Sequence, residues 1–327
     1  MSVSAPPLAG LTVRPYRPGD AAAITELVTR SDVADEVPWR VSVDEIESWL
    51  SRRNQHFDPT RDMRMVELDG RPVAYWQVDW VDTTDGLREY RISCVVDPDS
   101  RGRGIGAWML AEAEAYSRGR ARALPSDRPH FYGNWQPDTA RASIRLVERH
   151  GYEPVRYFFD MVRPTLDGIV EFPLPEGLEQ RPIADDQVLQ LWTADVEAFQ
   201  DHWGGFDGSP ERLEEWRRDP KWDPSLFVVV WDGDEIAGGV INEINATENA
   251  AFDRKRGWLA SVFVRRPWRR RGLGRALVAR SLVVFRERGM TSAGLGVDAA
   301  NPSGALRLYE EAGFEPEYRS TAFRKPM

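Results

Sequence analysis

Two segments of the chain combine arginine and glycine in a spacing that suits the binding of an anion. Each has the pattern Arg-x-x-Gly-x-Gly, and the two copies run from Arg101 to Gly106 and from Arg269 to Gly274. An apolar strand and a proline precede each turn, and a sequence with helical periodicity follows it. Such a turn exposes backbone N–H groups at the positive end of a helix, which suits a pyrophosphate. The pattern therefore predicts two anion-binding turns.

The sequence around the two turns repeats as well. Arg14-Pro15 and Arg181-Pro182 each close a short strand ahead of a helix, and Gly151-Tyr152 and Gly313-Phe314 follow the respective turns. A period of about 165 residues has the size of a whole domain and is far too long for a solenoid repeat. We expect two related domains, over residues 1–165 and 166–327, with a proline-containing linker at 164–177.

Length and composition narrow the class of protein. The chain has 327 residues, 42% of them hydrophobic, and a net charge of −9. No run approaches the roughly 18 apolar residues of a membrane helix, and the N-terminus has no signal-peptide pattern. The single cysteine, Cys94, excludes an intrachain disulfide, and the scattered histidines form no metal-ligand spacing. We expect a cytoplasmic protein without a metal or a membrane partner, and the negative charge argues against nucleic-acid binding.

Charge is unevenly distributed along the second half. From Glu197 to Glu248 there are 13 acids and 4 bases, whereas from Arg254 to Arg286 there are 11 bases and no acid. The basic stretch surrounds the second turn, where phosphates would bind. The acidic stretch either faces a cationic amine or forms an ordinary solvated surface, and both interpretations remain open.

The hydrophobic pattern predicts the same order of elements in both halves. In the first half we expect strands at 11–15, 63–68, 72–81, 90–96 and 130–133, two more around 152–162, and helices at 21–31, from 42, at 106–118 and at 139–149. In the second half we expect strands at 178–181, 226–231, 235–244, 257–264 and 292–297, two closing strands, and helices at 186–199, 211–218, 273–288 and 303–312.

The turn that follows a strand, together with Leu308 to Phe314 near the end, resembles the GNAT superfamily of acyl-CoA N-acyltransferases. The resemblance covers essentially the whole chain in two copies, and the second copy matches better. The tandem layout and the segment from Ala198 to Gly204 are similar to tandem members such as mycothiol synthase. The resemblance implies an α/β fold of the α+β type, with two tandem GNAT folds, each a mostly antiparallel, splayed sheet flanked by helices.

The resemblance also implies that acetyl-CoA is the cosubstrate. Its pyrophosphate would lie on a turn, and its pantetheine arm would pair with the strand before that turn. Asn301 occupies a place that contacts the CoA arm in the family. The CoA-binding residues that we expect are Val95, Val96, Arg101, Gly102, Arg103, Gly104, Ile105 and Gly106 in the first half and Phe263, Val264, Arg269, Arg270, Arg271, Gly272, Leu273, Gly274, Arg275 and Asn301 in the second.

Gly102-x-Gly104-x-x-Ala107 also fits a dinucleotide-binding fingerprint. A Rossmann turn should follow the first strand of its domain and have an acid about 20 residues further on at a strand end. The first turn follows several elements and is preceded by a proline, so we reject this interpretation.

Tyr309 is the expected catalytic acid. The resemblance places a tyrosine here that donates a proton to the departing CoA thiolate, and a phenol with a pKa near 10 suits that task. The first half has Val147 at the same place, so we expect the first domain to be non-catalytic and the second to be catalytic. Glu243 and His202 are candidate general bases. Other residues considered for proton transfer are Asp201, Asp298 and, by positioning a water, Ser261.

We therefore expect an enzyme that moves an acetyl group from acetyl-CoA to a primary amine of a small molecule by direct transfer in a ternary complex. Two alternatives remain. The chain could be a non-catalytic CoA-binding or regulatory protein, or an acyltransferase whose donor is a carrier protein or a larger acyl thioester.

Overall fold

The computed structural model describes residues 8–200, 202–300 and 304–327, and the chain divides into two compact units. Unit 1 contains the residues up to Arg156, together with Glu214–Pro220 and Ser320–Met327. Unit 2 contains Tyr157–Leu213 and Lys221–Arg319. Each unit therefore includes a strand segment from beyond the boundary predicted at 165/166. That boundary stays a prediction of where the two repeats meet in the sequence.

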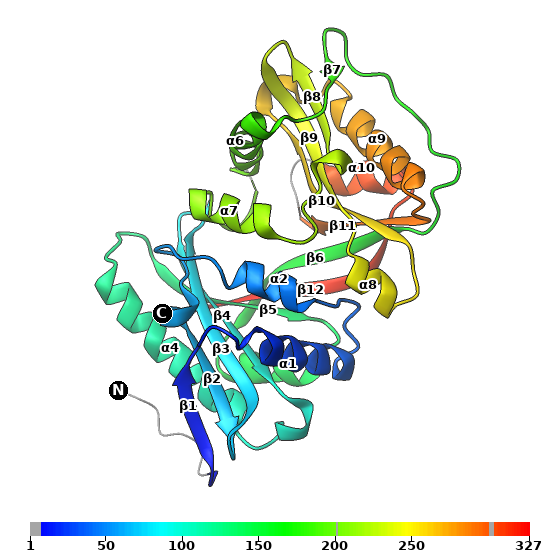
Figure 1. Cartoon of the computed structure of the whole chain (residues 1–327). Coiled ribbons are helices and arrows are strands. Elements are labelled where there is room, and N and C mark those ends of the chain that lie inside the picture. The colour runs from blue at the N-terminus through cyan, green and yellow to red at the C-terminus, as the bar shows by residue number, and fades with distance from the viewer. Residues whose placement is uncertain (1–7, 201, 301–303) are drawn as a thin grey trace. The chain divides into compact units, whose positions relative to one another are not determined.

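Unit 1 is a mixed sheet with helices on both faces (Figure 1). The sheet order is β1-β2-β3-β4-β5-β12, and every pair is antiparallel except β4 and β5, which are parallel. Its elements are β1 (Leu11–Pro15), α1 (Ala21–Ala34), α2 (Val43–Trp49), α3 (Pro59–Asp62), β2 (Met63–Leu68), β3 (Arg71–Asp82), β4 (Arg88–Val96), a 3-10 turn (Pro98–Ser100), α4 (Ile105–Ala123), β5 (His130–Pro137), α5 (Arg141–Arg149), the start of β6 (Glu153–Arg163) and the end of β12 (Glu315–Pro326).

Strand β3 shows why two helical layers form. Successive side chains of a strand point to opposite faces. Trp76 and Val78 pack in the same core as Trp108 and Met109 of α4. Tyr75, directly before Trp76, packs in a second core with Ile24 of α1. The alternation of apolar residues in β3 therefore buries both faces of the sheet.

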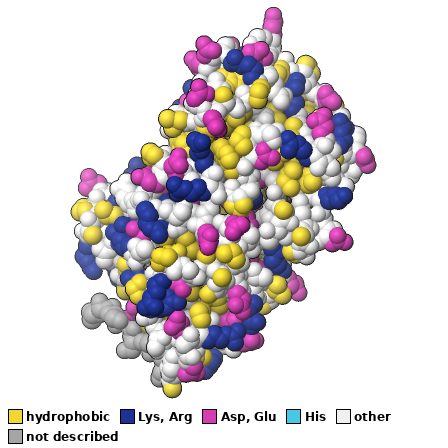
Figure 2. Space-filling model, in the orientation of Figure 1, with side chains coloured by type: hydrophobic (Ala, Val, Ile, Leu, Met, Phe, Trp, Pro, Cys, Tyr) yellow, Lys and Arg dark blue, Asp and Glu magenta, His cyan; other side chains and the backbone are white. Residues whose placement is uncertain are grey.

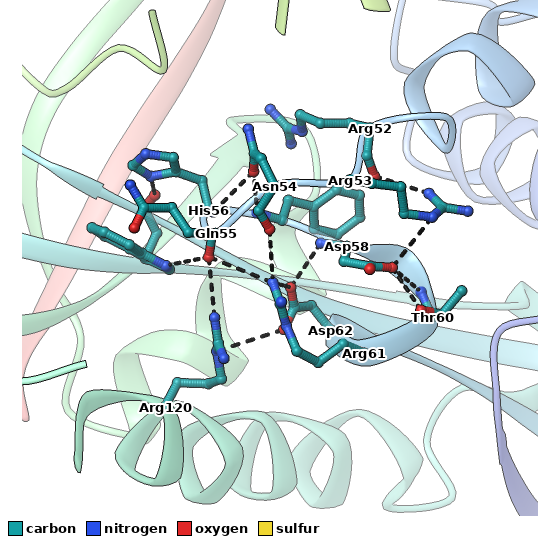
Figure 3. A network of polar contacts seen from close by, with 12 residues as sticks. Arg52, Arg53, Asn54, Gln55, His56, Asp58, Thr60, Arg61, Asp62 and Arg120 are labelled. Atoms are coloured by element: carbon teal, nitrogen blue, oxygen red, sulfur yellow. Dashed lines mark hydrogen bonds and ion pairs between the residues drawn. The ribbon is translucent and has the colours of Figure 1, made fainter. Parts of the chain in front are cut away.

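The loop between α2 and β2 is held by a buried carboxylate (Figure 3). Asp62, with only 1% of its surface exposed, accepts hydrogen bonds from the Asp58 N–H (2.8 Å), from the Arg61 guanidinium (2.7 Å) and from the Tyr116 hydroxyl. Arg120 of α4 forms a further ion pair with it at 3.7 Å. Both arginines also donate to the carbonyl of Gln55. The carboxylate thus ties the loop to α4.

We predict that Asp62→Ala lowers the free energy of unfolding by about 3 kcal/mol, because the substitution leaves partly buried guanidinium groups without their carboxylate. Urea denaturation followed by circular dichroism measures this change. The control is Asp127→Ala, which removes an exposed carboxylate of the same unit. Equal stability of the two variants would contradict the structural role of Asp62.

Unit 2 repeats this architecture. Its sheet order is β6-β11-β10-β9-β8-β7, with β10 and β11 parallel and the other pairs antiparallel. Helix α9 packs on β8 to β11, and α6 packs on β9 and β10. Its elements are the end of β6, β7 (Glu179–Gln180), α6 (Val188–Phe199), β8 (Val228–Asp232), β9 (Glu235–Glu243), α8 (Ala246–Ala251), β10 (Arg256–Val264), α9 (Leu273–Glu287), β11 (Ser292–Asp298), α10 (Ala305–Glu311), the start of β12, and 3-10 turns at Asp185–Gln187, Pro224–Leu226 and Arg266–Trp268, while α7 (Pro210–Arg218) has residues in both units.

The expected fold, a mostly antiparallel and splayed sheet flanked by helices in two copies, is confirmed. The structure differs in its details. Each pair of closing strands is one long strand, β6 or β12, and the short helices α3 and α8 were not expected. The predicted linker is not a free connection, because Leu166 is buried in the core of unit 2 and Ile169 packs against it. Among the described residues, no helix is both long and apolar enough to cross a membrane.

Candidate functional site

The central feature of unit 2 is the divergence of its two parallel strands. β10 pairs with β11 only from Arg256 to Leu259, and a bulge follows between Leu259 and Ser261. β11 is paired with β6 from Ala293 to Asp298, so it keeps this neighbour beyond the divergence, whereas β10 there pairs only with β9. In the part of the chain that the structure describes, residues 260–264 therefore have no strand partner on the β11 side. Their backbone groups can pair with an extended ligand.

Unit 1 has the same divergence, but a side chain bridges it. The parallel pairing of β4 with β5 ends at Arg91 and Gly133. The next residue of β5, Asn134, is 3% exposed and donates its side-chain amide to the carbonyl of Ile92 at 2.8 Å. Counting from the last paired residues, the counterpart of Asn134 in unit 2 is Gly296, which has no side chain. The opening is therefore bridged by Asn134 in unit 1, whereas the corresponding residue of unit 2 cannot form such a bridge.

The turn before α9 has the geometry expected of an anion site. Gly272 caps the helix in the left-handed conformation (φ 86°), and the N–H of Ala276 donates to its carbonyl at 3.3 Å. The N–H groups before Ala276 have no acceptor within the helix. Arg270 also has a left-handed φ of 61°, whereas unit 1 has Gly102 (φ 75°) at this position. A non-glycine residue in this region is strained, and such strain is found at functional sites.

The first arginine of each turn has a structural role. Arg269 donates to the carbonyls of Val264 (2.9 Å) and Ala198 (3.3 Å), which joins the end of β10 to the end of α6. Arg101 forms an ion pair with Asp35, just after α1, at 2.7 Å, and donates to the Val96 carbonyl. The sequence pattern alone did not separate this role from phosphate binding.

Three other arginines at the second turn, Arg270, Arg271 and Arg275, could bind an anion. Arg271 donates to the backbone carbonyl of Glu176 at 3.3 Å, and the Arg275 guanidinium lies 5.3 Å from the centre of the Phe172 ring. Within the described residues, neither these two side chains nor Arg270 pairs with a carboxylate. Together with the exposed N–H groups they form a cationic cradle that fits a pyrophosphate.

The rest of the basic stretch is partly neutralised by the acidic one. Arg265 pairs with Glu197 (2.9 Å) and Glu235 (3.4 Å), and Arg254 pairs with Glu248. On the face shown in Figure 2, acidic and basic side chains are interspersed. These three carboxylates thus serve ion pairs within unit 2, which favours the interpretation of a solvated surface for this part of the acidic stretch.

Tyr309 lies on α10 with 6% of its surface exposed and packs edge-on against Phe314, with ring centres 6.1 Å apart. Burial raises the pKa of its phenol to about 12, so the hydroxyl keeps its proton at neutral pH. Within the described part of the chain the hydroxyl makes no hydrogen bond. Val147, its counterpart in unit 1, is buried in an apolar core.

The candidate bases lie on different elements. Glu243 ends β9 and is in register with Trp258, on the paired side of the divergence. His202 follows α6, with its ring 4.3 Å from that of Phe199. Asn301, expected to contact the CoA arm, lies outside the described residues, as does Asp201. The roles expected of Glu243 and His202 stay predictions.

A polar pair near the divergence was missed by the sequence analysis. Ser261, considered only as a residue that positions water, donates its hydroxyl to the carboxylate of Asp195 at 2.5 Å. Asp195 lies on α6 and is 6% exposed. The internal repeat could have indicated Asp195, because the position that corresponds to it in the first half is the apolar Val28.

The CoA-binding residues expected in unit 1 occupy corresponding places. Val95 and Val96 pair with β3, and Ile105 and Gly106 begin α4 after the left-handed Gly104. A Cβ atom at Gly106 would lie 3.2 Å from the Leu146 side chain, so this glycine also permits close packing of α4 on α5.

The diverging parallel strands, the cationic cradle at a helix N-terminus and the buried tyrosine define the class of protein. The sequence model of the acetyltransferase (GNAT) family matches residues 25–152 and 190–314, and the chain belongs to this family. It is a GNAT-type N-acetyltransferase with two tandem GNAT folds, a family that uses acyl-CoA.

Particular relatives agree with this assignment. The chain is 29% identical over 316 residues to the mycothiol acetyltransferase of Geodermatophilus obscurus, an alignment that covers 94% of this chain and 95% of that protein. A GCN5-related N-acetyltransferase from Sphaerobacter thermophilus superposes with a TM-score of 0.70 at 27% identity, over 97% of this chain and 96% of that one. A tandem GNAT protein from the clavulanic acid biosynthesis pathway shares the fold, with a TM-score of 0.66 at 16% identity, over 97% and 98% of the two chains.

We predict that Arg270→Gly, which gives the second turn the residue found in the first, weakens CoA binding about tenfold, or by about 1.4 kcal/mol, through loss of a charged contact. The thermal unfolding temperature should not fall, because glycine adopts a left-handed φ without strain. Isothermal calorimetry and a thermal melt measure the two effects.

The control is Arg280→Ala, which removes the same charge further along α9, where Arg280 donates to the side chain of Gln180. If both variants weakened binding equally, the effect would be one of net charge, and Arg270 would have no special role at the turn.

Proposed function

We propose that the protein transfers an acetyl group from acetyl-CoA to a primary amine of a small molecule, directly in a ternary complex, and that unit 2 performs the reaction. The observation that carries the proposal is the difference between two units of the same fold. Unit 2 combines an unbridged divergence, Arg270 in a strained conformation and Tyr309. Unit 1 has Asn134, Gly102 and Val147 in the same places.

Each part of unit 2 has a task in this proposal. The N–H groups of the turn and the guanidinium groups of Arg270 and Arg271 hold the pyrophosphate. The free backbone edge of residues 260–264 pairs with the pantetheine arm. Tyr309 retains its proton until sulfur develops negative charge, and then donates it to the leaving thiolate. Glu243 and His202 remain candidate bases.

Unit 1 is proposed to be a structural or CoA-holding partner. It retains the turn from Arg101 to Gly106, so an anion could still bind there. Valine at position 147 cannot transfer a proton, and Asn134 already satisfies the Ile92 carbonyl. The amide would have to leave this carbonyl before a ligand could pair with it.

We expect Tyr309→Phe to lower kcat by about 10²–10⁴-fold while leaving acetyl-CoA binding nearly intact, because the hydroxyl acts on the leaving group and not on the ground-state complex. Thiol release with a panel of primary amines gives kcat, and calorimetry gives the affinity. The control is Tyr152→Phe, which removes a buried tyrosine hydroxyl from unit 1 and supplies the residue that unit 2 has there, Phe314. Full turnover by Tyr309→Phe would make Tyr309 a packing residue.

A matched pair of glycine substitutions tests which unit is catalytic. Gly274→Asp should abolish transfer, since the carboxylate would repel the pyrophosphate. A Cβ atom there meets nothing closer than the Leu308 side chain at 3.4 Å, so the unit should still fold. Gly106→Asp should change stability or CoA stoichiometry but spare most of the rate. The reverse pattern of rates would place catalysis in unit 1.

A further inference from the structure

Asp195 is a buried carboxylate that has no cationic partner in the part of the chain that the structure describes. It is 6% exposed on α6, and among the described residues the hydroxyl of Ser261, at 2.5 Å, is its hydrogen-bond partner. Burying a carboxyl group with one neutral hydrogen-bond partner costs free energy of folding. Such groups are often found at functional sites.

The fold itself does not require a carboxylate at this position. Aligning Arg14-Pro15 with Arg181-Pro182 places Ile24 opposite Leu191, and both are fully buried. The same alignment places Val28 opposite Asp195, and Val28 packs against an apolar core. Unit 1 therefore fills this place with an apolar side chain. The carboxylate is particular to unit 2, as Tyr309 is.

The pair lies where the strands of unit 2 separate. Ser261 follows the bulge that comes after Leu259, the last residue of β10 that pairs with β11. Leu259 and Val262 pack in the core that contains α9, whereas Ser261 bonds to α6 on the opposite face. Ala260 beside it is exposed, and Ser261 is half-buried. The hydroxyl thus connects the buried carboxylate to the open part of the strand.

The charged groups around Asp195 do not account for its protonation behaviour. On α6 and β9 these groups are Glu197, Glu235 and Glu243, on β10 there is Arg256, and Arg265 directly follows β10. Arg265 pairs with Glu197 and Glu235, and Arg256 pairs with Glu317. Burial raises the pKa of Asp195 to about 6, and the hydrogen bond from Ser261 opposes this rise. The carboxyl group therefore titrates close to neutral pH.

We propose that Ser261 and Asp195 form the route by which the attacking amine loses its proton, with Ser261 contacting the nitrogen and Asp195 acting through Ser261. This inference rests on the proposed function of unit 2. It assigns a role in proton transfer to Asp195 of α6 and so accounts for the buried carboxylate.

The amine nitrogen forms a bond to the acetyl carbon and becomes acidic; its proton passes to the Ser261 oxygen as the hydroxyl proton of Ser261 passes to the Asp195 carboxylate. The carbon–sulfur bond breaks, its electron pair goes to sulfur, and sulfur takes the proton of Tyr309. Asp195 then releases one proton to solvent and Tyr309 regains one, so the enzyme is restored.

This route predicts two dependences on pH. Asp195 must be ionised to accept a proton, so kcat should rise as pH increases through about 6. Without CoA, the contribution of Asp195 to stability should fall as pH rises from the usual aspartate pKa, near 4, to about 6, because this carboxyl group ionises more readily in the unfolded chain than in the folded one. Above that range this loss is complete.

The test compares the wild type with Asp195→Asn, Asp195→Val, Ser261→Ala and Ser261→Thr. Acetyl-CoA is the donor, and amino sugars, amino acid esters and diamines are the acceptors. We expect Asp195→Asn and Ser261→Ala each to lower kcat by about 10²-fold or more and to remove the rise near pH 6. Their combination should lose little more than either alone, because the two residues act as one unit. Ser261→Thr keeps a hydroxyl and should keep the profile.

Asp195→Val supplies the side chain of unit 1 and should fold with stability at pH 8 equal to or above that of the wild type, while losing the same activity. Thermal melts from pH 4 to 8 without CoA provide a readout independent of turnover: the decline between pH 4 and 6 should be smaller in Asp195→Asn. An unchanged kcat profile in Asp195→Asn would overturn the route. So would loss of the rise in Glu243→Gln but not in Asp195→Asn. Failure of the wild type to acetylate any amine would overturn the proposed function itself.

Discussion

The site of unit 2 depends on the loss of one of the two hydrogen-bonding neighbours of β10 partway along that strand. After Leu295, β11 continues beside β6 and leaves β10 behind. Strand hydrogen bonds are obligatory for buried backbone, so a strand that loses one neighbour inside a sheet must find another partner. The edge of β10 from residue 260 onward is therefore a preformed place for an extended ligand. The bulge, Ser261 and the turn before α9 all follow this point within a short length of chain.

The second copy of the fold serves as an internal comparison. The two units share their strand order, their parallel pair and their left-handed glycine before the long helix. They differ at four places where chemistry is proposed. The pairs, with unit 1 first, are Gly102 and Arg270, Asn134 and Gly296, Val147 and Tyr309, and Val28 and Asp195. At these four places, the non-glycine residue with a left-handed φ, Arg270, and the buried carboxylate, Asp195, both belong to unit 2, as expected where function opposes stability.

How far the sequence predicts this arrangement depends on how local each signal is. The turns could be predicted because their glycines and arginines lie within six residues. Aligning the two repeats predicted that Val147 occupies the position of Tyr309 in the first half. The structural role of Arg269 could not be predicted from the sequence, since the carbonyl of Ala198 that accepts its hydrogen bond lies 71 residues away. The bond between Ser261 and Asp195 spans 66 residues, and each residue alone is unremarkable in its element. The long single strands β6 and β12 carry no sequence mark of the place where they pass from one unit to the other.

Because β12 runs from unit 2 into unit 1, the order of synthesis limits when unit 1 can fold. The end of β12, which pairs with β5 in unit 1, follows the whole of unit 2 in the chain. A ribosome therefore exposes β5 with an open edge until unit 2 has been synthesised. Unit 1 cannot complete its sheet as an independent domain during translation, and the contacts that close it are of very long sequence separation, which slows folding. Arg324, which pairs with the buried Glu89, and Lys325, which pairs with Glu114, add charged contacts to this late step.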